Sequence, residues 1–503
     1  RMCGIVAVTG YKKALPLLMN GLEKLEYRGY DSAGIAIVNP ETKNIICNKA
    51  EGKLKNLIKN LNDKNMPGTV GIGHTRWATH GKPEIKNAHP HTNSSGTIAV
   101  VQNGIIENFQ DLKNKLQKEG VIFNSDTDTE VIPHLIQREL NTLSKLNLDK
   151  NGSTLLVAVR NVISDLEGSY ALAVLWADAP TALVVARRQA PLIIGLGEGE
   201  FICASDTPAI ANFTNIILPM EDEEIALLTP LGIEIYDSNN ERQYRSPVSL
   251  KVSEQIMDKM NFKHFMLKEI YDQPETAKNW LKNYLIKNLE SGQYQINYPF
   301  DTKFFESIER IEIIACGTSK HAAMVGKFLL EQFSGIPTNV FYASEFRYSP
   351  PPLLPNTLTI GVTQSGETAD TIAAIDMEIK RRSSKEDKKF TPNLIAITNR
   401  KESSIGRQVL NIIDICAGIE VGVAATKTFF GQLLSFYGLA IKFAQIKGTQ
   451  SSDEVDKLIT ELIKLPPLIE DLLEQHNESS EKLAHDFFNI KDVIFLGRGI
   501  NYP

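Results

Sequence analysis

The sequence predicts a multidomain α/β protein in which packed antiparallel sheets come first and a parallel sheet follows. Three observations support this fold class. Short β-branched runs separated by Gly, Pro and Asn dominate before residue 240 or so, residues 237–252 are polar and irregular, and strands alternate with helices afterwards. The 503 residues are 42% hydrophobic, which is enough apolar material for more than one buried core.

The first 240 residues contain six short apolar runs and two longer helical patterns. Antiparallel sheets flanked by helices are the natural arrangement for this order of elements. The expected helices span Leu15–Leu25 and Thr129–Leu140. The expected strands are Ile5–Val8, Gly34–Val38, Thr97–Val101, Tyr170–Leu175, Ala182–Ala186 and Ile225–Leu228.

After a linker at 237–252 and a helical stretch over Phe265–Leu289, strands and helices alternate. Alternation of this kind predicts a parallel sheet covered on both faces. The helix over Glu367–Lys380, for example, places isoleucines at i, i+3 and i+7. The other expected elements are strands Arg310–Cys316, Thr357–Thr363 and Leu394–Thr398 and helices Ser319–Gln332 and Thr426–Ile446.

Composition excludes several classes of protein. The net charge is -6 and no basic cluster is visible, so we expect no nucleic-acid partner. No apolar stretch reaches about 18 residues, and Lys12 and Lys13 interrupt the start of the chain, which predicts a cytoplasmic protein without a membrane span. Five cysteines without CxxC spacing, and His89 and His91 without a third ligand, indicate neither disulfides nor a metal site.

The end of the chain repeats an earlier layout. Asp492–Gly499 resembles Glu312–Ser319, because both read as an apolar strand that runs into a Gly-containing turn. A single strand cannot form a parallel domain alone. We therefore expect a truncated chain in which a second parallel-sheet unit begins near residue 491.

Cys3 starts the first predicted strand, where a thiol is ordinarily a small buried hydrophobe. Three polar segments change this interpretation: His74–Gly81, Gln102–Gly104 and Ser125–Val131. Together they offer what cleavage of a carboxamide needs: a nucleophile, a base, an oxyanion site and a substrate clamp.

A cysteine at a mature N-terminus carries its own base, because its α-amino group is partly neutral at cellular pH. Asn103 and the N–H of Gly104 can donate to an oxyanion, Arg76 offers a fork for an α-carboxylate, and Asp128 can hold an α-ammonium. Arg1 and Met2 precede Cys3. With both retained, the α-amino group lies two residues from the thiol and cannot serve as its base, so we expect no glutaminase activity in that form.

These segments, with Cys3–Val6 and Tyr27–Ser32, resemble the αββα glutaminase domain of the N-terminal-nucleophile amidotransferases. The resemblance implies that Cys3 is the nucleophile and that Asn103 and Gly104 form the oxyanion hole. It assigns Trp77 to the gate between the glutaminase site and the ammonia path, and makes Arg28 structural. The implied glutamine-binding residues are Arg76, Trp77, Thr79, His80 and Asp128.

Two hydroxyl-rich turns, Cys316–Ser319 and Thr363–Thr368, each lie between a predicted strand and a predicted helix. Ligands of open α/β sheets bind at such strand ends, and a helix N-terminus favours a phosphate. Ordinary N-capping by Ser and Thr is the alternative explanation for either turn alone.

Both turns, with Ala343–Tyr348 and Glu420–Phe429, resemble the first sugar isomerase (SIS) domain, a parallel-sheet α/β fold. Thr363 and Ala425 stand where that family usually has serine, and Ala425 leaves the recognition of one sugar hydroxyl open. The resemblance implies that the sugar-phosphate contacts are Thr318, Ser319, Thr363, Gln364, Ser365 and Thr368, with Val423 near the sugar.

The set and order of motifs are similar to the glucosamine-6-phosphate synthase family. That resemblance implies transfer of ammonia from glutamine to fructose 6-phosphate, a homodimer, no metal or organic cofactor, and isomerase catalytic residues beyond Pro503. The expected domains are glutaminase 1–240, connection 241–295, first SIS domain 296–447, helical connection 448–490 and the start of a second SIS domain at 491–503.

Two other functions remain open at this point. An amidophosphoribosyltransferase would share the glutaminase half, but it would need a phosphoribosyl-diphosphate loop with paired acidic residues, and none follows residue 300. A non-enzymatic sugar-phosphate sensor would leave Cys3, Arg76, Asn103 and Asp128 without a purpose.

Overall fold

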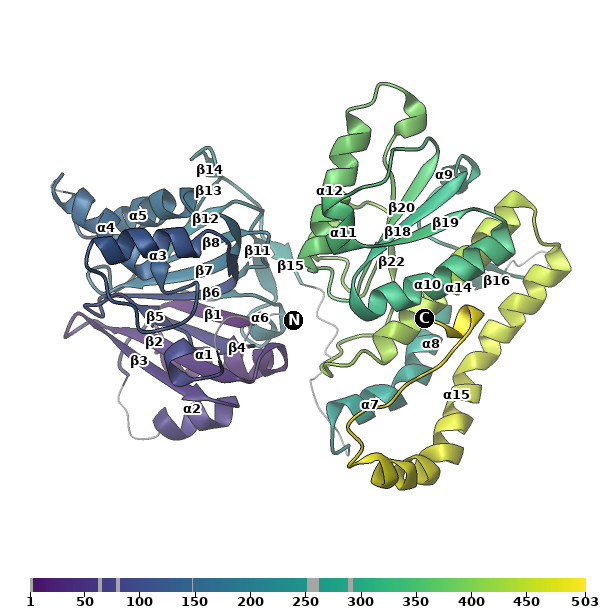
Figure 1. The fold of residues 1–503 in the computed structure, drawn as a ribbon, viewed down its shortest axis with the longest axis horizontal. Coiled ribbons are helices and arrows are strands. Elements are labelled where there is room, and N and C mark those ends of the chain that lie inside the picture. Colours follow the sequence, from purple (N-terminus) through teal and green to yellow (C-terminus); the bar gives the residue numbers. More distant parts are fainter. Residues whose placement is uncertain (1–2, 62–65, 78–81, 147, 251–261, 288–292) are drawn as a thin grey trace. The chain divides into compact units, whose positions relative to one another are not determined.

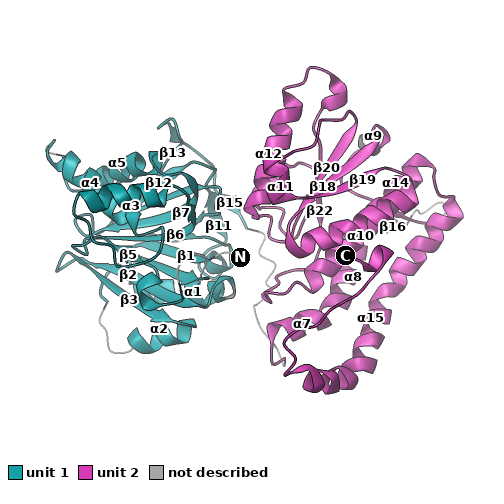
Figure 2. Cartoon of the chain, viewed as in Figure 1, with its two compact units in different colours: residues 1–254 teal, residues 255–503 magenta. Residues whose placement is uncertain are grey.

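The computed structural model describes residues 3–61, 66–77, 82–146, 148–250, 262–287 and 293–503. The chain divides into two compact units, Arg1–Glu254 and Gln255–Pro503 (Figure 2). Each unit is described by itself below.

The first unit contains an eight-stranded antiparallel sheet in the order β15-β11-β9-β10-β1-β4-β2-β3. The order places β1, which follows Cys3, in the interior of the sheet between β10 and β4. Its strands are β1 Gly4–Gly10, β2 Ser32–Asn39, β3 Asn44–Glu51, β4 Gly71–Arg76, β9 Ile193–Leu196, β10 Glu200–Ala204, β11 Ile216–Pro219 and β15 Val248–Ser249.

A second antiparallel sheet of seven strands has the order β14-β13-β12-β8-β7-β6-β5. Its long strands β6 and β7 pair along their whole length, from Ile98 opposite Trp176 to Ile106 opposite Gly168. Its strands are β5 His91–Thr92, β6 Ile98–Ile106, β7 Gly168–Trp176, β8 Leu183–Arg188, β12 Ile225–Thr229, β13 Gly232–Tyr236 and β14 Arg242–Gln243.

The two sheets pack face to face and helices cover both outer faces (Figure 1). Alternation along the strands explains the layers: Ile5 and Ala7 of β1 enter the core between the sheets, whereas Val6 and Val8 pack under the helices. Helices α1 (Ala14–Leu25) and α2 (Leu54–Leu61) cover the first sheet, and α3 (Phe109–Lys118), α4 (Val131–Ser144) and α5 (Gly152–Ser164) cover the second. This is the expected αββα sandwich.

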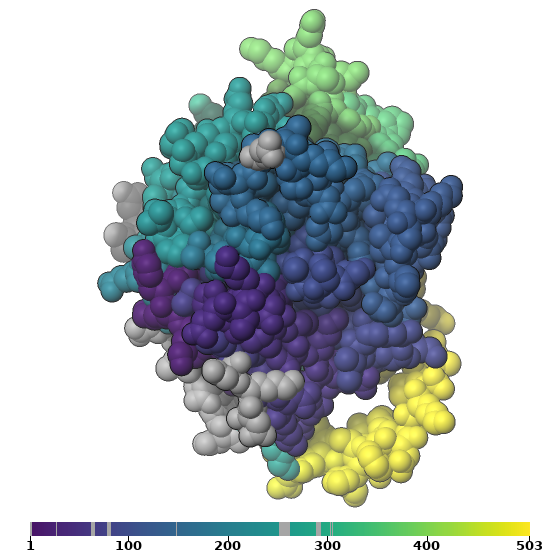
Figure 3. Space-filling model, turned by 90° about the vertical axis from the view of Figure 1, so that its left-hand side faces the viewer, coloured from purple at the N-terminus to yellow at the C-terminus, as the bar shows by residue number. Residues whose placement is uncertain are grey.

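Segments far apart in the sequence lie side by side on the surface of the first unit. Figure 3 shows purple atoms of the first residues beside blue and teal atoms of residues between about 100 and 230. A short helix, α6 (Pro208–Ala211), and the 3₁₀ turns η1 (Glu26–Arg28) and η2 (Ile85–Asn87) complete this unit.

The second unit is built on a five-stranded parallel sheet in the order β19-β18-β20-β21-β22. Its inner strands are strongly apolar, as expected for a sheet buried on both faces. Its strands are β18 Arg310–Ala315, β19 Thr338–Tyr342, β20 Thr357–Thr363, β21 Asn393–Thr398 and β22 Ile412–Asp414, and a separate hairpin joins β16 Leu285–Lys287 to β17 Tyr294–Ile296.

Helices cover both faces of the parallel sheet. Ile313 of β18 packs into the core that contains α8, α10, α14 and α15, whereas Ile314 packs with α11, α12 and α13. The helices are α7 Phe265–Tyr271, α8 Gln273–Tyr284, α9 Thr302–Glu306, α10 Gly317–Ser334, α11 Ala343–Tyr348, α12 Ala369–Ser383, α13 Ser404–Gln408, α14 Lys427–Lys447 and α15 Ser452–Phe487; η3 (Lys388–Phe390) and η4 (Gly499–Asn501) are 3₁₀ turns.

The predicted fold class is confirmed, but three local predictions are wrong. The predicted linker contains β14 and β15. The predicted helix over Phe265–Leu289 is instead α7, α8 and then β16, and Pro274 lies in the first turn of α8. Asp492–Gly499 forms no strand, because it pairs with no neighbour among the described residues. No helix within those residues is long and apolar enough to cross a membrane.

Candidate active site

Cys3 lies at the entrance of β1, beside the end of β4. The antiparallel pairing of these strands sets Gly4 opposite Thr75 and so brings Cys3 to Arg76 and Trp77. The backbone N–H of Trp77 donates to the Cys3 sulfur at 3.2 Å, and the thiol lies 3.5 Å from the Trp77 carbonyl oxygen. The side chain is half-buried. The backbone of Trp77 therefore holds the sulfur.

The backbone carbonyl of Cys3 accepts two side-chain hydrogen bonds. Asn103 Nδ2 donates to it at 2.9 Å and Arg28 Nε at 3.3 Å. Arg28, in η1, also pairs through Nη1 with Asp206 Oδ2 at 2.6 Å, and both side chains are almost completely buried. Three distant segments thus converge on the first described residue of the chain.

Asn103 and Gly104 lie inside β6, whereas the sequence placed them after a strand that ended at Val101. Gly104 has φ +115° and pairs with Tyr170. A Cβ at this position would lie 2.1 Å from the Ser169 carbonyl oxygen, so only glycine fits. The sequence predicts that Asn103 and Gly104 lie after the strand because Asn and Gly are rare inside strands.

Arg76 and Asp128 both lie in this region and both are buried. Asp128 Oδ2 accepts from the backbone N–H of Ile106 at 2.8 Å. Burial lowers the pKa of Arg76, and the charges of Cys3, Asp31 and Asp128 oppose this effect in part. The indole of Trp77 packs edge-on against Tyr30, with ring centroids 5.0 Å apart. Thr79 and His80, which the sequence predicts to bind glutamine, lie outside the described residues.

Burial determines the protonation of the nucleophile. Burial raises the pKa of the Cys3 thiol, and the Trp77 hydrogen bond and the charges of Arg76 and Arg28 oppose this effect without cancelling it. The thiol is therefore mainly protonated at neutral pH. Attack on an amide then requires a base that takes the thiol proton.

The two turns predicted to bind a phosphate lie next to each other in the second unit. Strands β18 and β20 are parallel neighbours, with Ala315 opposite Val362, so the turns that follow them leave the same edge of the sheet. Ser319, in the first turn of α10, accepts a hydrogen bond from Gln432 Nε2 of α14 at 3.0 Å. The adjacent Thr318 lies in the same turn.

The turn after β20 is also organised by its hydroxyl groups. Thr363 Oγ1 and Thr368 Oγ1 lie 2.7 Å apart, and the backbone N–H of Glu367 donates to Ser365 Oγ at 3.1 Å. Gln364, which lies between Thr363 and Ser365 in the sequence, is partly exposed. Gly366 has φ +70°, which lets the turn close against Ser403. The hydroxyl groups of this turn hydrogen-bond within the turn, and Thr363 itself is buried.

Val423 lies in the loop between β22 and α14 and is 64% exposed. Glu269 of α7 holds this loop by accepting hydrogen bonds from the backbone N–H groups of Val421 and Gly422. Glu420 closes its other end by accepting from Thr426. The sequence analysis did not identify the two glutamates, because acidic side chains that bind a loop backbone have no spacing signature.

Comparison with known proteins bears on both sites. The model of the glutamine amidotransferase domain matches residues 74–212, and that of the SIS domain matches residues 304–442. Glutamine–fructose-6-phosphate aminotransferase (isomerizing) of Thermosynechococcus vestitus is 52% identical over 506 residues, which cover 100% of this chain and 79% of that protein. The chain belongs to the glutamine–fructose-6-phosphate aminotransferase (isomerizing) family.

Two further proteins to which the chain is similar carry related names. The protein of the same name from a Nostoc species is 51% identical over 100% of this chain and 79% of its own length. A solved C-terminal domain of glucosamine-fructose-6-phosphate aminotransferase from Francisella tularensis is 31% identical, with a TM-score of 0.44, and the match covers 48% of this chain and 64% of that one. Membership in this family, with matches over the whole of this chain, favours the aminotransferase over both alternative functions.

The sequence analysis missed two residues of the glutaminase site. His74 Nε2 lies 2.9 Å from Asn103 Oδ1, and Asp206 pairs with Arg28. His74 lies within the recognised HTRWATHG segment, but nothing there shows that its ring turns towards Asn103. Asp206 belongs to no segment that the sequence singles out.

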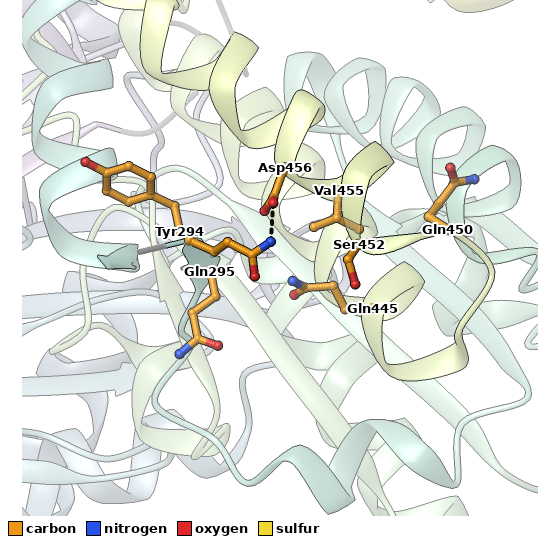
Figure 4. A pocket seen from close by; sticks show the side chains of 8 residues that line it. Tyr294, Gln295, Gln445, Gln450, Ser452, Val455 and Asp456 are labelled. Carbon is orange, nitrogen blue, oxygen red and sulfur yellow. Dashed lines mark hydrogen bonds between the residues drawn. The ribbon is translucent and has the colours of Figure 1, made fainter. Parts of the chain in front are cut away.

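A separate cavity of about 230 Å³ in the second unit is lined by no cysteine, histidine or arginine of the described residues. Figure 4 shows its polar side chains, among which Gln293 donates to Asp456 at 2.6 Å. None of the predicted site residues lines it. Over the described part of the chain, no group of three or more His, Cys, Asp or Glu side chains is placed to hold a metal ion. The lining residues are Gln293, Tyr294, Gln295, Gln445, Gln450, Ser452, Val455 and Asp456.

Proposed function

We propose that Cys3 cleaves the side-chain amide of glutamine and that the ammonia released aminates fructose 6-phosphate, giving glutamate and glucosamine 6-phosphate. The observation that carries the proposal is the direct hydrogen bond from Asn103 to Cys3, which joins the predicted nucleophile to the predicted oxyanion donor. The family assignment supplies the two substrates.

The glutaminase step uses groups of the first unit. When Cys3 is the first residue, its own α-amino group takes the thiol proton, and the sulfur attacks the amide carbon of glutamine. Asn103 Nδ2 and the Gly104 N–H donate to the resulting oxyanion. The tetrahedral intermediate collapses by breaking its C–N bond, the proton passes to the leaving nitrogen, and water then hydrolyses the thioester.

Arg76 and Asp128 fit the α-carboxylate and the α-ammonium of glutamine. The guanidinium matches a carboxylate and the carboxylate matches an ammonium, and burial strengthens both interactions. Trp77, whose backbone holds the sulfur, is well placed to sense an occupied site. Thr79 and His80 are part of the proposal through the family resemblance alone.

Sugar phosphate would bind at the edge of the parallel sheet formed by the ends of β18 and β20. The proposed contacts are the hydroxyl groups of the two turns, where hydrogen-bond donors and helix N-termini favour an anion. They comprise Thr318, Ser319, Thr363, Gln364, Ser365 and Thr368, with Val423 at the sugar.

We also propose a cytoplasmic homodimer that needs no organic cofactor or metal. All five cysteines are free, which suits a reducing compartment. The same proposal places the glutaminase domain at residues 1–240, the connection at 241–295, the first SIS domain at 296–447 and the helical connection at 448–490.

The deciding experiment is glutamine hydrolysis by protein whose first residue is confirmed as Cys3, measured with and without fructose 6-phosphate. We expect glutamate release in the wild type and none in Cys3→Ala. The variant should still bind fructose 6-phosphate, since that site lies in the other unit. Glutamate release by Cys3→Ala would contradict the assignment of the nucleophile.

A further inference from the structure

Three histidines are stacked behind the glutaminase site, and the reaction described above uses none of them. All three are buried: His74 lies in β4, His91 lies in β5, and His89 precedes β5 by two residues. The rings of His74 and His89 lie 4.2 Å apart and nearly parallel, and those of His89 and His91 meet edge to face at 4.8 Å. Buried imidazoles need hydrogen-bond partners, so their contacts reveal their role.

The hydrogen bonds fix which way the Asn103 amide points. A carbonyl oxygen can only accept, so the group that contacts the Cys3 carbonyl at 2.9 Å must be Nδ2. Oδ1 therefore faces His74, whose Nε2 lies 2.9 Å away. Because Oδ1 can only accept, His74 Nε2 carries a hydrogen and donates it.

The second histidine of the stack is fixed in the same way. His89 Nδ1 accepts from the backbone N–H of Gln102 at 3.2 Å, so the hydrogen of its neutral ring is on Nε2. That atom lies 3.4 Å from Thr129 Oγ1, which donates to Gln102 Oε1 at 2.8 Å. Burial lowers the pKa of His74 to about 3 and that of His89 well below its usual value, so both rings are neutral.

The hydrogen bond from His74 also joins the two sheets. His74 lies opposite Ile5 in the sheet whose β1 begins beside Cys3, whereas Asn103 belongs to β6 of the other sheet. The bond therefore ties the predicted oxyanion donor to the sheet that carries the nucleophile. The two groups must keep a fixed separation for the reaction.

We propose that His74 is a positioning residue for glutamine hydrolysis, which holds the Asn103 amide with its N–H groups towards the oxyanion and strengthens them as donors. A flipped amide would present oxygen lone pairs to the developing negative charge. Hydrogen bonding to Oδ1 also polarises the amide, so that its N–H groups donate more strongly. This inference rests on the roles proposed for Cys3 and Asn103.

The test replaces His74 in full-length protein that begins at Cys3. Loss of one buried hydrogen bond corresponds to about 1.4 kcal/mol, so His74→Leu should lower kcat for glutamine hydrolysis about tenfold, with KM changed less than about twofold. The γ-semialdehyde of glutamate adds to the thiol and places an oxyanion against Asn103. Its inhibition constant should rise about tenfold in the variant, whereas binding of glutamate should not change.

The side-chain amides provide a sharper pair of variants. Gln can place an N–H near the position of Nε2, whereas Asn reaches only as far as Nδ1. His74→Gln should therefore recover most of kcat and His74→Asn should not. This pair decides the question even where His74→Leu does not fold, which thermal unfolding would reveal.

His91→Leu is the matched control. His91 is equally buried in the same stack, but its Nε2 contacts Thr127 Oγ1 at 3.0 Å and not Asn103. The kcat of the His91→Leu variant for glutamine hydrolysis should stay within about threefold of the wild-type value. Equal losses in the two leucine variants, or a raised KM with unchanged kcat in His74→Leu, would overturn the inference. An inactive wild type, or an active Cys3→Ala, would instead refute the proposed function.

Discussion

Replacement of Asp206 by asparagine tests how the first residue of β1 is held. Asp206 pairs with Arg28 at 2.6 Å, and the side chains are only 12% and 5% exposed. Arg28 in turn donates to the carbonyl of Cys3. Asparagine keeps the size and the Oδ1 acceptor that binds the Thr207 N–H at 2.8 Å, but it removes the charge and replaces Oδ2, which accepts from Arg28, with an NH2 donor.

The expected loss follows from burial. Removal of one partner from a buried ion pair leaves an uncompensated charge and costs roughly 3 to 5 kcal/mol. Because both side chains are slightly exposed here, we take the lower end, about 3 kcal/mol. For a unit of this size each kcal/mol lowers Tm by about 2 to 4 °C, which gives a decrease of about 6 to 12 °C.

The measurement is thermal and urea unfolding of the full chain, in which the unfolding transition of the first unit is monitored. Asp178→Asn is the matched control, because Asp178 pairs with Lys150 at 2.8 Å but the side chains are 32% and 65% exposed. It should lose less than about 1 kcal/mol. Equal effects of the two substitutions would show that burial of the Arg28 pair does not stabilise the site.

Three further predictions concern the nucleophile, the oxyanion site and the parallel sheet. Protein that keeps Arg1 and Met2 should release no glutamate in a glutaminase assay, because its α-amino group is two residues away from the thiol. Gly104→Ala should lower kcat about 100-fold or more in the same assay, because the new Cβ would displace the strand that carries an oxyanion donor. Burial, and secondarily the charge of Glu378, raises the pKa of Glu312 from 4.5 to about 6, so its contribution to stability is present below pH 4.5 and is lost as the pH rises through 6. Glu312→Gln should therefore increase the free energy of unfolding by up to about 2 kcal/mol at pH 8 and by much less at pH 5, as urea titrations would show.

The sequence predicts the layered fold because each layer follows from a local pattern. Strand Thr357–Thr363 has the predicted bounds, and α1 and α14 differ from their predictions by one residue at one or both ends. Their apolar residues recur with the period of the element. The predictions for residues 237–289 miss β14, β15 and β16, because strands as short as these form only where a neighbouring strand pairs with them, and composition does not show that partner.

The candidate site is predictable only in part for a related reason. Chemistry-bearing segments such as HTRWATHG can be recognised because their residue types are unusual together. The strand position of Asn103, the inward turn of His74 and the pairing of Asp206 depend on contacts between distant segments. The hydrogen bonds concerned join residues 29 to 178 positions apart in the chain. No spacing within one segment carries that information.

The contacts of Cys3 suit the proposed active form, in which this residue would be the first of the chain. A first residue has only its side chain, its carbonyl and its amine by which it can be held. Here Arg28 and Asn103 bind the carbonyl and the backbone of Trp77 binds the sulfur. This set of contacts orients the residue without using its nitrogen, and so an α-amino group at this position would keep its lone pair for the thiol proton. The same carbonyl contacts would form with two residues still attached, which is why removal of those residues should change the rate of the reaction much more than the stability of the fold.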